Sequence, residues 1–188
     1  MLGLARELGL RWQLVFALWS LGDALVFRGD AARALPLLEE GCAIVDELGA
    51  RGQIPELHAR AALASVGVDD LDRARRHVRA AQQVLIDSDH DSYWITQVAA
   101  AKLAAAEGDR PAAEVVLREA IARLEPTGFG YALARTRYAY GALLVEWGRA
   151  DDARAPLRAA REFFRDPLAV GWQRRIDALL ARAGAPAT

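Results

Sequence analysis

Few residues of this 188-residue chain combine the types and the spacing that chemistry needs. The stretch DSDHD places Asp87, Asp89 and Asp91 at alternate positions, as the first ligands of a calcium loop are placed. The position where such a loop has glycine is Ser92, and its last ligand, normally glutamate, is replaced by Val98. We therefore predict a solvated loop before a helix that Asp91 or Ser92 caps, with calcium binding as the weaker alternative.

Histidine and cysteine, the usual zinc ligands, are scattered along the chain. His58, His77 and His90 lie on separate segments without the short spacings of zinc sites, so surface or helix-packing roles are expected for them. Cys42 is the only cysteine, which excludes an intramolecular disulfide and any site built from several cysteines. Its apolar neighbours indicate a small buried residue and not a reactive thiol. No metal site and no cofactor is predicted.

Motifs for catalysis and for phosphate binding are also missing. The sequence has no phosphate-binding glycine loop, nucleophile elbow or zinc-protease histidine pair, so we expect no catalytic residue and no enzyme. Four arginines between Arg73 and Arg79 could contact phosphate, but Asp69, Asp70 and Asp72 directly precede them. A solvated face with internal ion pairs is the stronger interpretation of this segment.

Composition limits the class of protein. Apolar residues make up 53% of the chain and charged residues 26%, which is typical of a folded protein with a core and a length near one domain. The formal charge of −1 provides no general attraction to nucleic acid or to an anionic membrane. No apolar run approaches the ~18 residues of a membrane span, and the amino terminus lacks a secretion signal. A cytoplasmic protein with neither nucleic-acid nor membrane partners is expected.

The elements that must position any site are repeated. Four segments of the chain share a turn residue followed, five residues later, by an alanine, and these alanines are spaced by 40, 39 and 40 residues. Such a regular period predicts an array of similar helical units. The turn residues are Gly29, Asp69, Gly108 and Gly148, and the alanines, here called the anchor alanines, are Ala34, Ala74, Ala113 and Ala153.

The similarity extends from each anchor alanine in helical steps. A large apolar residue follows after four residues, a small residue after seven, and another small residue precedes the anchor by twelve. This pattern predicts two closely packed helices joined by a tight turn, in which glycine ends the first helix and Asp30 or Asp109 caps the second. The large residues are Leu38, Val78, Leu117 and Leu157; the small ones are Gly41, Ala81, Ala120 and Ala160, and Gly22, Ala62, Ala101 and Gly141.

Leu21-Gly22, Leu25, Ala34, Leu38 and Gly41, with the corresponding sets in later copies, resemble the tetratricopeptide repeat. The resemblance implies an all-α fold, a right-handed α-α superhelix of four helical hairpins plus a terminal capping helix. The chain departs from the family pattern by lacking a large aromatic residue near position 18 and a proline near position 46. Its repeat is also longer than the usual ~34 residues.

The resemblance covers nearly the whole chain, so a single solenoid domain is expected over residues 1–188. The motif E-L-G-x-R at residues 7–11 recurs at residues 47–51, which indicates a partial hairpin at the start and favours a carboxy-terminal fragment of a longer protein. The capping helix would hide the last apolar face of the array. The expected bounds are 1–9 for the partial hairpin, about 10–49, 54–88, 92–127 and 130–166 for the full hairpins, and about 170–183 for the capping helix.

The long repeat, the E-L-G-x-R loops and the richness in alanine and arginine are similar to the sensor regions of large bacterial signalling proteins. These are LuxR-type regulators of the maltose-activator kind and cyclase-fused ATPases. The resemblance implies a non-enzymatic module for protein or peptide interaction or for sensing, within a larger signalling or transcription-regulatory protein. A structural unit that associates with its own copy, for example as a homodimer, is the alternative.

In the tetratricopeptide family the first helix of each hairpin lines a concave groove, and the resemblance implies which residues would do so here. Lysine and asparagine, with which one subgroup grips acidic carboxy termini, are replaced by Phe16, Ser20 and Asp23, so that clamp is not expected. An apolar groove suits an amphipathic helix, a hydrophobic segment of a protein partner or a neighbouring domain of the same polypeptide. Trp19 and Tyr138 either anchor such a partner or pack between hairpins. The implied groove residues are Phe16, Trp19, Asp23, Val26, Glu56, Ala59, Leu63, Ile95, Val98, Lys102, Arg135, Tyr138 and Ala142.

Overall fold

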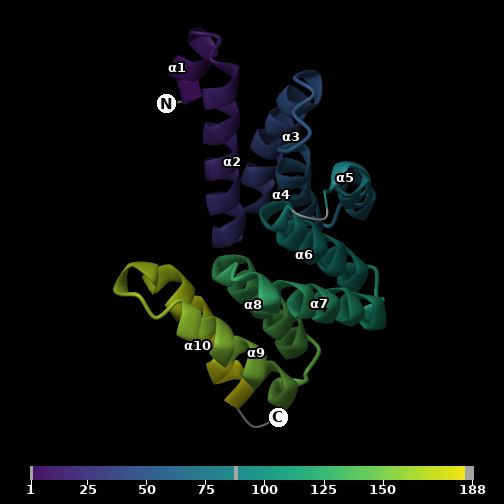
Figure 1. The fold of residues 1–188 in the computed structure, drawn as a ribbon, viewed down its shortest axis with the longest axis vertical. Coiled ribbons are helices and arrows are strands. Elements are labelled where there is room, and N and C mark those ends of the chain that lie inside the picture. The colour runs from purple at the N-terminus through teal and green to yellow at the C-terminus, as the bar shows by residue number, and fades with distance from the viewer. Residues whose placement is uncertain (1, 87–88, 185–188) are drawn as a thin grey trace. The chain divides into compact units, whose positions relative to one another are not determined.

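The computed structural model describes residues 2–86 and 89–184, and within these ranges every regular element is a helix (Figure 1). No helix in the described part of the chain has both the length and the apolar character needed to cross a membrane. The chain divides into two compact units, Met1–Arg110 and Pro111–Thr188. The boundary falls at the start of a helix, inside the third predicted hairpin.

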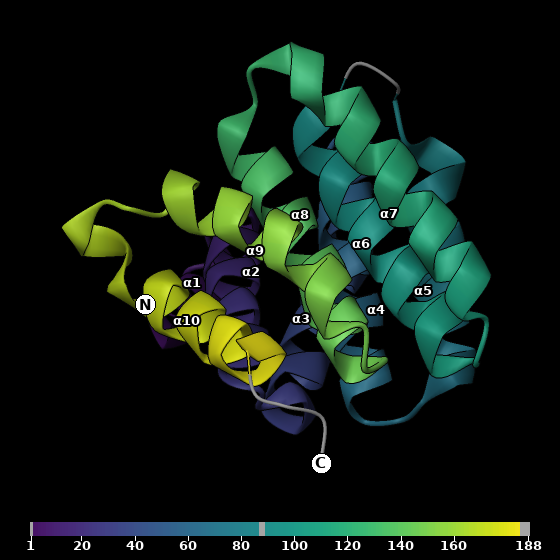
Figure 2. The same cartoon turned by 90° about the horizontal axis from the view of Figure 1, so that it is seen from below.

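The first unit is a row of helices in which each packs on the ones before and after it along the chain. Helix α4 lies at its centre and contacts α2, α3, α5 and α6, while α1 packs on α2 and pairs through Arg6 with Glu40 of α3 (Figures 1 and 2). Side chains from α2, α3 and α4 form its apolar core. The helices are α1 (Leu2–Glu7), α2 (Arg11–Arg28), α3 (Ala31–Glu47), α4 (Ile54–Gly67), α5 (Leu71–Val84) and α6 (His90–Ala106).

In the second unit α8 packs on α9, and α10 packs on both. Its core is formed by buried residues of these helices, with Phe164 and Ile176 among them. The turn after α9 is closed by a short 3₁₀ segment, in which Asp166 accepts a hydrogen bond of 2.7 Å from the Leu168 N–H. The elements are α7 (Arg110–Leu124), η1 (Glu125–Thr127), α8 (Gly130–Glu146), α9 (Ala150–Phe163), η2 (Pro167–Ala169) and α10 (Val170–Gly184).

The four repeated turns have one geometry, as the sequence predicts. Gly29, Gly108, Gly148 and Asp69 all adopt positive φ, with values of 82°, 89°, 77° and 61°. In each turn the next residue donates its N–H to the carbonyl five residues before it, at 2.8 to 3.0 Å. This hydrogen bond satisfies one of the carbonyls that the end of a helix leaves open, and it turns the chain into the second helix.

The helix caps differ from those expected at Asp30 and at the start of α6. Asp30 makes no side-chain cap bond, and its carboxylate pairs with the Arg33 guanidinium at 3.1 Å. Asp70, a cap that the sequence did not indicate, accepts a hydrogen bond of 3.0 Å from the N–H of Arg73. Helix α6 is capped by Asp89, which accepts from the Ser92 N–H at 3.1 Å, and not by Asp91 or Ser92. Asp87, the first position of the possible calcium loop, lies outside the described residues.

The small residues at the repeated positions lie where two helices pack closely, as the repeat predicts. All four anchor alanines are fully buried. A Cβ atom added at Gly22 would lie 2.6 Å from Cγ of Leu38, and one added at Gly141 would lie 2.5 Å from Cγ of Leu157. The same pair of repeat positions therefore touches in the first and the fourth copies.

Candidate functional site

The implied groove residues lie on the first helix of each hairpin, but the structure leaves only some of them accessible. Phe16 is 52% exposed, whereas Ile95 is fully buried and Val98 and Glu56 nearly so. A peptide bound to the described surface could therefore reach Phe16 but not Ile95. The half-buried members are Trp19, Asp23 and Val26 on α2, Leu63 on α4, Lys102 on α6, and Arg135 and Tyr138 on α8.

Arg60 joins three of these residues into a packed polar network. Its Nε donates to Asp23 Oδ1 at 3.1 Å, its guanidinium pairs with the Glu56 carboxylate, and its Cζ lies 4.8 Å from the ring centre of Trp19. Arg60 is 6% exposed. Burial raises the pKa of Glu56, and the neighbouring Arg60 charge opposes that rise. Trp19 is thus half-buried against Arg60, a contact that suits the packing interpretation.

Tyr138 has a comparable packing role in the second unit. Its ring meets Trp172 of α10 edge to face at 5.2 Å, and Phe164 stacks on the same indole at 5.0 Å. The Arg135 guanidinium lies 4.4 Å from the Trp172 ring centre. Tyr138 and Arg135 thus hold α10 against α8, and Trp172 is the partner that the sequence did not indicate.

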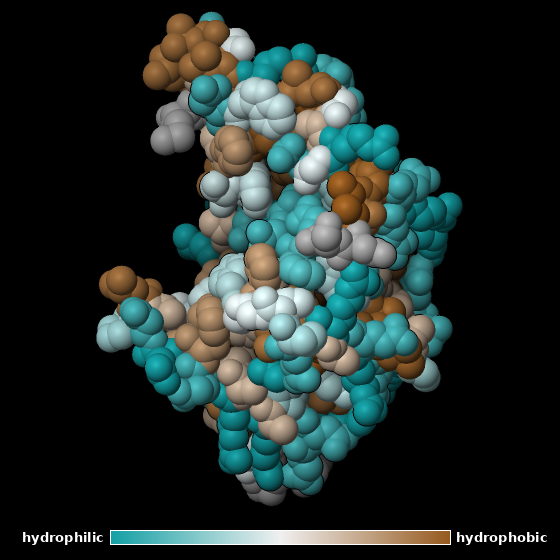
Figure 3. Space-filling view, in the orientation of Figure 1, coloured by the Kyte–Doolittle hydropathy of each residue, from teal (hydrophilic) through white to brown (hydrophobic). Residues whose placement is uncertain are grey.

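An accessible apolar surface lies on α2, at a place we call the α2 hollow. It is an open depression of about 850 Å³, and none of the described residues that line it carries a charge. Phe16 and Leu21, which are 52% and 40% exposed, form its apolar rim. Apolar side chains also gather around α1 and the start of α2 (Figure 3). The residues of the α2 hollow are Gly3, Gln13, Phe16, Ala17, Ser20, Leu21 and Ala24.

In the later repeats the centre of the corresponding helix face is covered. The residues equivalent to Ala17, counted from each anchor alanine, are Leu57, Thr96 and Thr136, and all three are fully buried. Leu57 is covered by α3, because a Cβ atom added at Gly41 would lie 3.1 Å from its Cδ2. The helical pair α2 and α3 packs on α4, whereas α2 is preceded, in the described part of the chain, by the six-residue α1.

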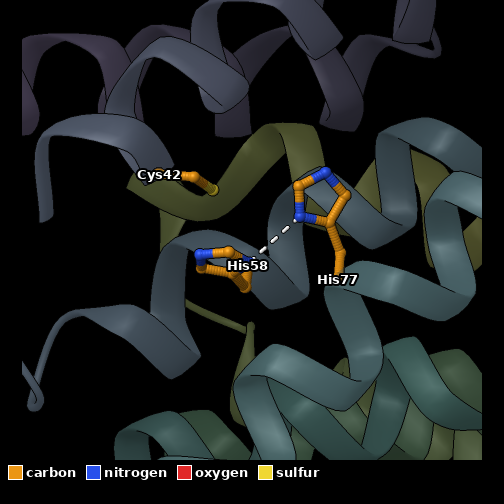
Figure 4. A group of neighbouring side chains, drawn as sticks. All are labelled: Cys42, His58 and His77. Atoms are coloured by element: carbon orange, nitrogen blue, oxygen red, sulfur yellow. Dashed lines mark hydrogen bonds between the residues drawn. The ribbon is translucent and has the colours of Figure 1, made fainter. Parts of the chain in front are cut away.

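A second group of chemically capable residues meets in the first unit, although the sequence spacing gives no sign of it. Cys42 of α3, His58 of α4 and His77 of α5 approach one another so that one donor atom from each lies within 4.8 Å of the others (Figure 4). Nδ1 of His58 lies 3.1 Å from Nδ1 of His77. The residues are 16 and 19 positions apart in the chain, and only the packing of three consecutive helices brings them together.

Burial and neighbouring charges set the chemistry of this group, which we call the Cys-His cluster. Cys42 is 3% exposed, and burial raises the pKa of its thiol. Burial, followed by the nearby His58, lowers the pKa of His77 to about 4. Both imidazoles approach carboxylates of α3: the Asp46 oxygens lie 3.3 Å from His58 Nε2, and Glu39 Oε1 lies 3.8 Å from His77 Nε2.

The arginine-rich segment on α5 has the ion-paired character expected from the sequence. Arg73 pairs with Asp70 at 2.9 Å and with Glu39 at 3.2 Å, and Arg75 pairs with Asp72 at 2.5 Å and with Glu107. These acids compensate the positive charge of the segment where it faces α3 and the end of α6.

Comparison with known proteins yields neither a matching family model nor a matching curated protein for this chain.

Proposed function

We propose that this chain is a non-enzymatic interaction module of the tetratricopeptide type, with its hairpins arranged as a right-handed superhelix. It acts by binding a helical segment of a protein partner, or of a neighbouring domain in a larger bacterial signalling protein. The repeated turns, the buried anchor alanines and the glycine–leucine contact of two copies support the family assignment.

One observation carries the binding site: the α2 hollow is open, while the position equivalent to Ala17, at its centre, is fully buried in every later repeat. On α4 the equivalent face is covered by packed helices. We therefore expect the face of α2 that forms the hollow to accept a helix in the same way. Ala17, Ser20 and Ala24 are small and allow a close approach of backbone, and Phe16 and Leu21 offer apolar contact on the flanks.

The expected occupant follows from this lining. Because the described lining of the hollow is uncharged, a partner gains from apolar residues at every third or fourth position and gains nothing there from a charged stripe. An amphipathic helix that presents its apolar face to α2 fits these requirements. A carboxy-terminal acidic peptide does not fit them.

The test places a photoreactive phenylalanine analogue at position 16 of the full chain, in cells of its source organism. Mass spectrometry of the adducts identifies the cross-linked residues. We expect adducts on one helical segment of a partner, with contacts spaced three or four residues apart, and their loss when Leu21→Asp is added. The matched control carries the same analogue at Leu168. This residue is 93% exposed and does not line the α2 hollow.

Adducts that do not differ between positions 16 and 168 would contradict the proposal. Adducts to another copy of this chain would instead support the self-association alternative. Light scattering after gel filtration checks that outcome independently, because a monomer at high protein concentration excludes it.

A further inference from the structure

The Cys-His cluster combines three donor atoms with the supporting groups that metal ligands need. Thiolate sulfur and imidazole nitrogen are the ligands that zinc-class ions prefer, and magnesium or calcium would select oxygen atoms instead. Glu39, Cys42 and Asp46 lie on one face of α3, and the two histidines come from the helices that follow it. Three packed helices therefore hold the donors.

The two imidazoles are arranged so that a cation can bind between their Nδ1 atoms. The Asp46 carboxylate lies 3.3 Å from Nε2 of His58, and the Glu39 carboxylate lies 3.8 Å from Nε2 of His77. The two Nδ1 atoms face each other across a hydrogen bond of 3.1 Å, in which one of them carries the proton (Figure 4). A cation bound between them takes the place of that proton, and a carboxylate near the far nitrogen is the usual support of a metal-bound histidine.

The distances suit one tetrahedral ion. Bonds of about 2.0 Å to nitrogen and about 2.3 Å to sulfur place the donor atoms of such an ion roughly 3.3 to 3.6 Å apart. The Nδ1 atoms are already near that separation, and the sulfur lies within 4.8 Å of the other donors. Side-chain rotations that move the sulfur by about 1 Å bring all three donor atoms to bonding distance of one ion.

We propose that Cys42, His58 and His77 bind one divalent ion of the zinc class and thereby link α3, α4 and α5. The ion forms one bond to sulfur and one to each imidazole, and the Cys42 thiol releases its proton to solvent as the sulfur–metal bond forms. Water completes the fourth position. A nucleophilic role for Cys42 fits less well, because a substrate cannot reach a side chain that is 3% exposed. The site is separate from the α2 hollow and does not depend on the proposed function.

The test titrates the reduced, chelator-treated full chain with Co²⁺ and then with Zn²⁺. Co²⁺ should produce a sulfur-to-cobalt charge-transfer band that saturates at one ion per chain, and Zn²⁺ should abolish the band. Free Zn²⁺ at a hundred times its dissociation constant should raise the folding equilibrium constant about a hundredfold. His90→Gln, which changes the histidine outside the cluster, should leave all three results unchanged.

Cys42→Ser should remove the charge-transfer band, and His77→Gln should weaken cobalt binding at least tenfold. X-ray absorption of the zinc-loaded wild type gives a second measurement that needs no variant, and it should show one sulfur and two imidazoles around the ion. A wild type without a saturable band, or a zinc ion surrounded by oxygen alone, would overturn the proposal. An unchanged band in folded Cys42→Ser would do the same.

Discussion

At the scale of single residues, Arg60 shows how a buried charge is supported in this fold. Its contacts with Asp23 and the Trp19 ring join α4 to α2, and its pair with Glu56 lies within α4. Glu56 is 8% exposed, so its carboxylate depends on Arg60. Removing one partner of a buried ion pair usually costs more than replacing both, because it leaves an uncompensated charge.

Arg60→Met should therefore lower the free energy of unfolding by about 3 to 5 kcal/mol at pH 7. The loss should be smaller at pH 5, because burial raises the pKa of Glu56 and the variant can bury a protonated carboxyl. The stabilising effect of that proton is present at low pH and disappears as the pH rises through the pKa of the folded state. Urea unfolding at the two pH values measures both effects.

Glu56→Gln added to Arg60→Met is the matched control and should recover much of the lost stability at pH 7. Equal losses at pH 5 and pH 7, with no recovery in the double variant, would show that Arg60 acts through packing alone.

Tyr140 is a second residue whose surroundings predict a measurable effect. Its hydroxyl donates to Glu114 Oε1 at 2.7 Å, and the other oxygen of that carboxylate pairs with Arg149. Burial, assisted by the carboxylate, raises the pKa of Tyr140 to about 12. An unfolded tyrosine loses its proton near pH 10, so folding keeps a proton that the unfolded chain releases.

The stability of the wild type relative to Tyr140→Phe should consequently fall as the pH rises from 10 to 12. Alkaline titration of the folded protein, followed by tyrosinate absorbance, should show one late step that Tyr140→Phe removes. Tyr131→Phe, which changes an exposed tyrosine, should leave the late step in place. Survival of that step in Tyr140→Phe would contradict the assignment.

At the scale of helices, the features that the sequence predicted best are local ones. The glycine that ends a helix and the anchor alanine five residues later depend only on neighbouring residues of the chain. Their recurrence gives the length of the repeat directly. The contact of Gly22 with Leu38 follows from the same period, because helices joined by a short turn must pack on each other. The Asp30 cap expected from sequence propensity is absent, although Asp70 at the equivalent position of the next repeat does cap its helix. Both carboxylates pair with an arginine three residues later, so this pairing alone does not decide which of them caps.

At the scale of the whole molecule, the sequence could not indicate which helix faces are open. The groove register placed Phe16 and Ile95 at one repeat position, 18 residues before their anchor alanines, yet their exposure is 52% and 0%. The Cys-His cluster was missed for the same reason. Its residues meet through the packing of α3, α4 and α5, which no spacing along the chain encodes.

The difference in exposure between Phe16 and Ile95 gives the sharpest test that the α2 hollow is open. Ile95→Ala removes a buried side chain and should lower the free energy of unfolding by about 2 to 5 kcal/mol. Phe16→Ala should cost at most about 1 kcal/mol, since its ring is largely in water and loses little beyond its stacking on Trp19. Urea unfolding of both variants at low and high protein concentration makes the comparison. If Phe16→Ala costs as much as Ile95→Ala at both concentrations, Phe16 is buried in the free chain. If the cost of Phe16→Ala grows with protein concentration, a second copy covers it.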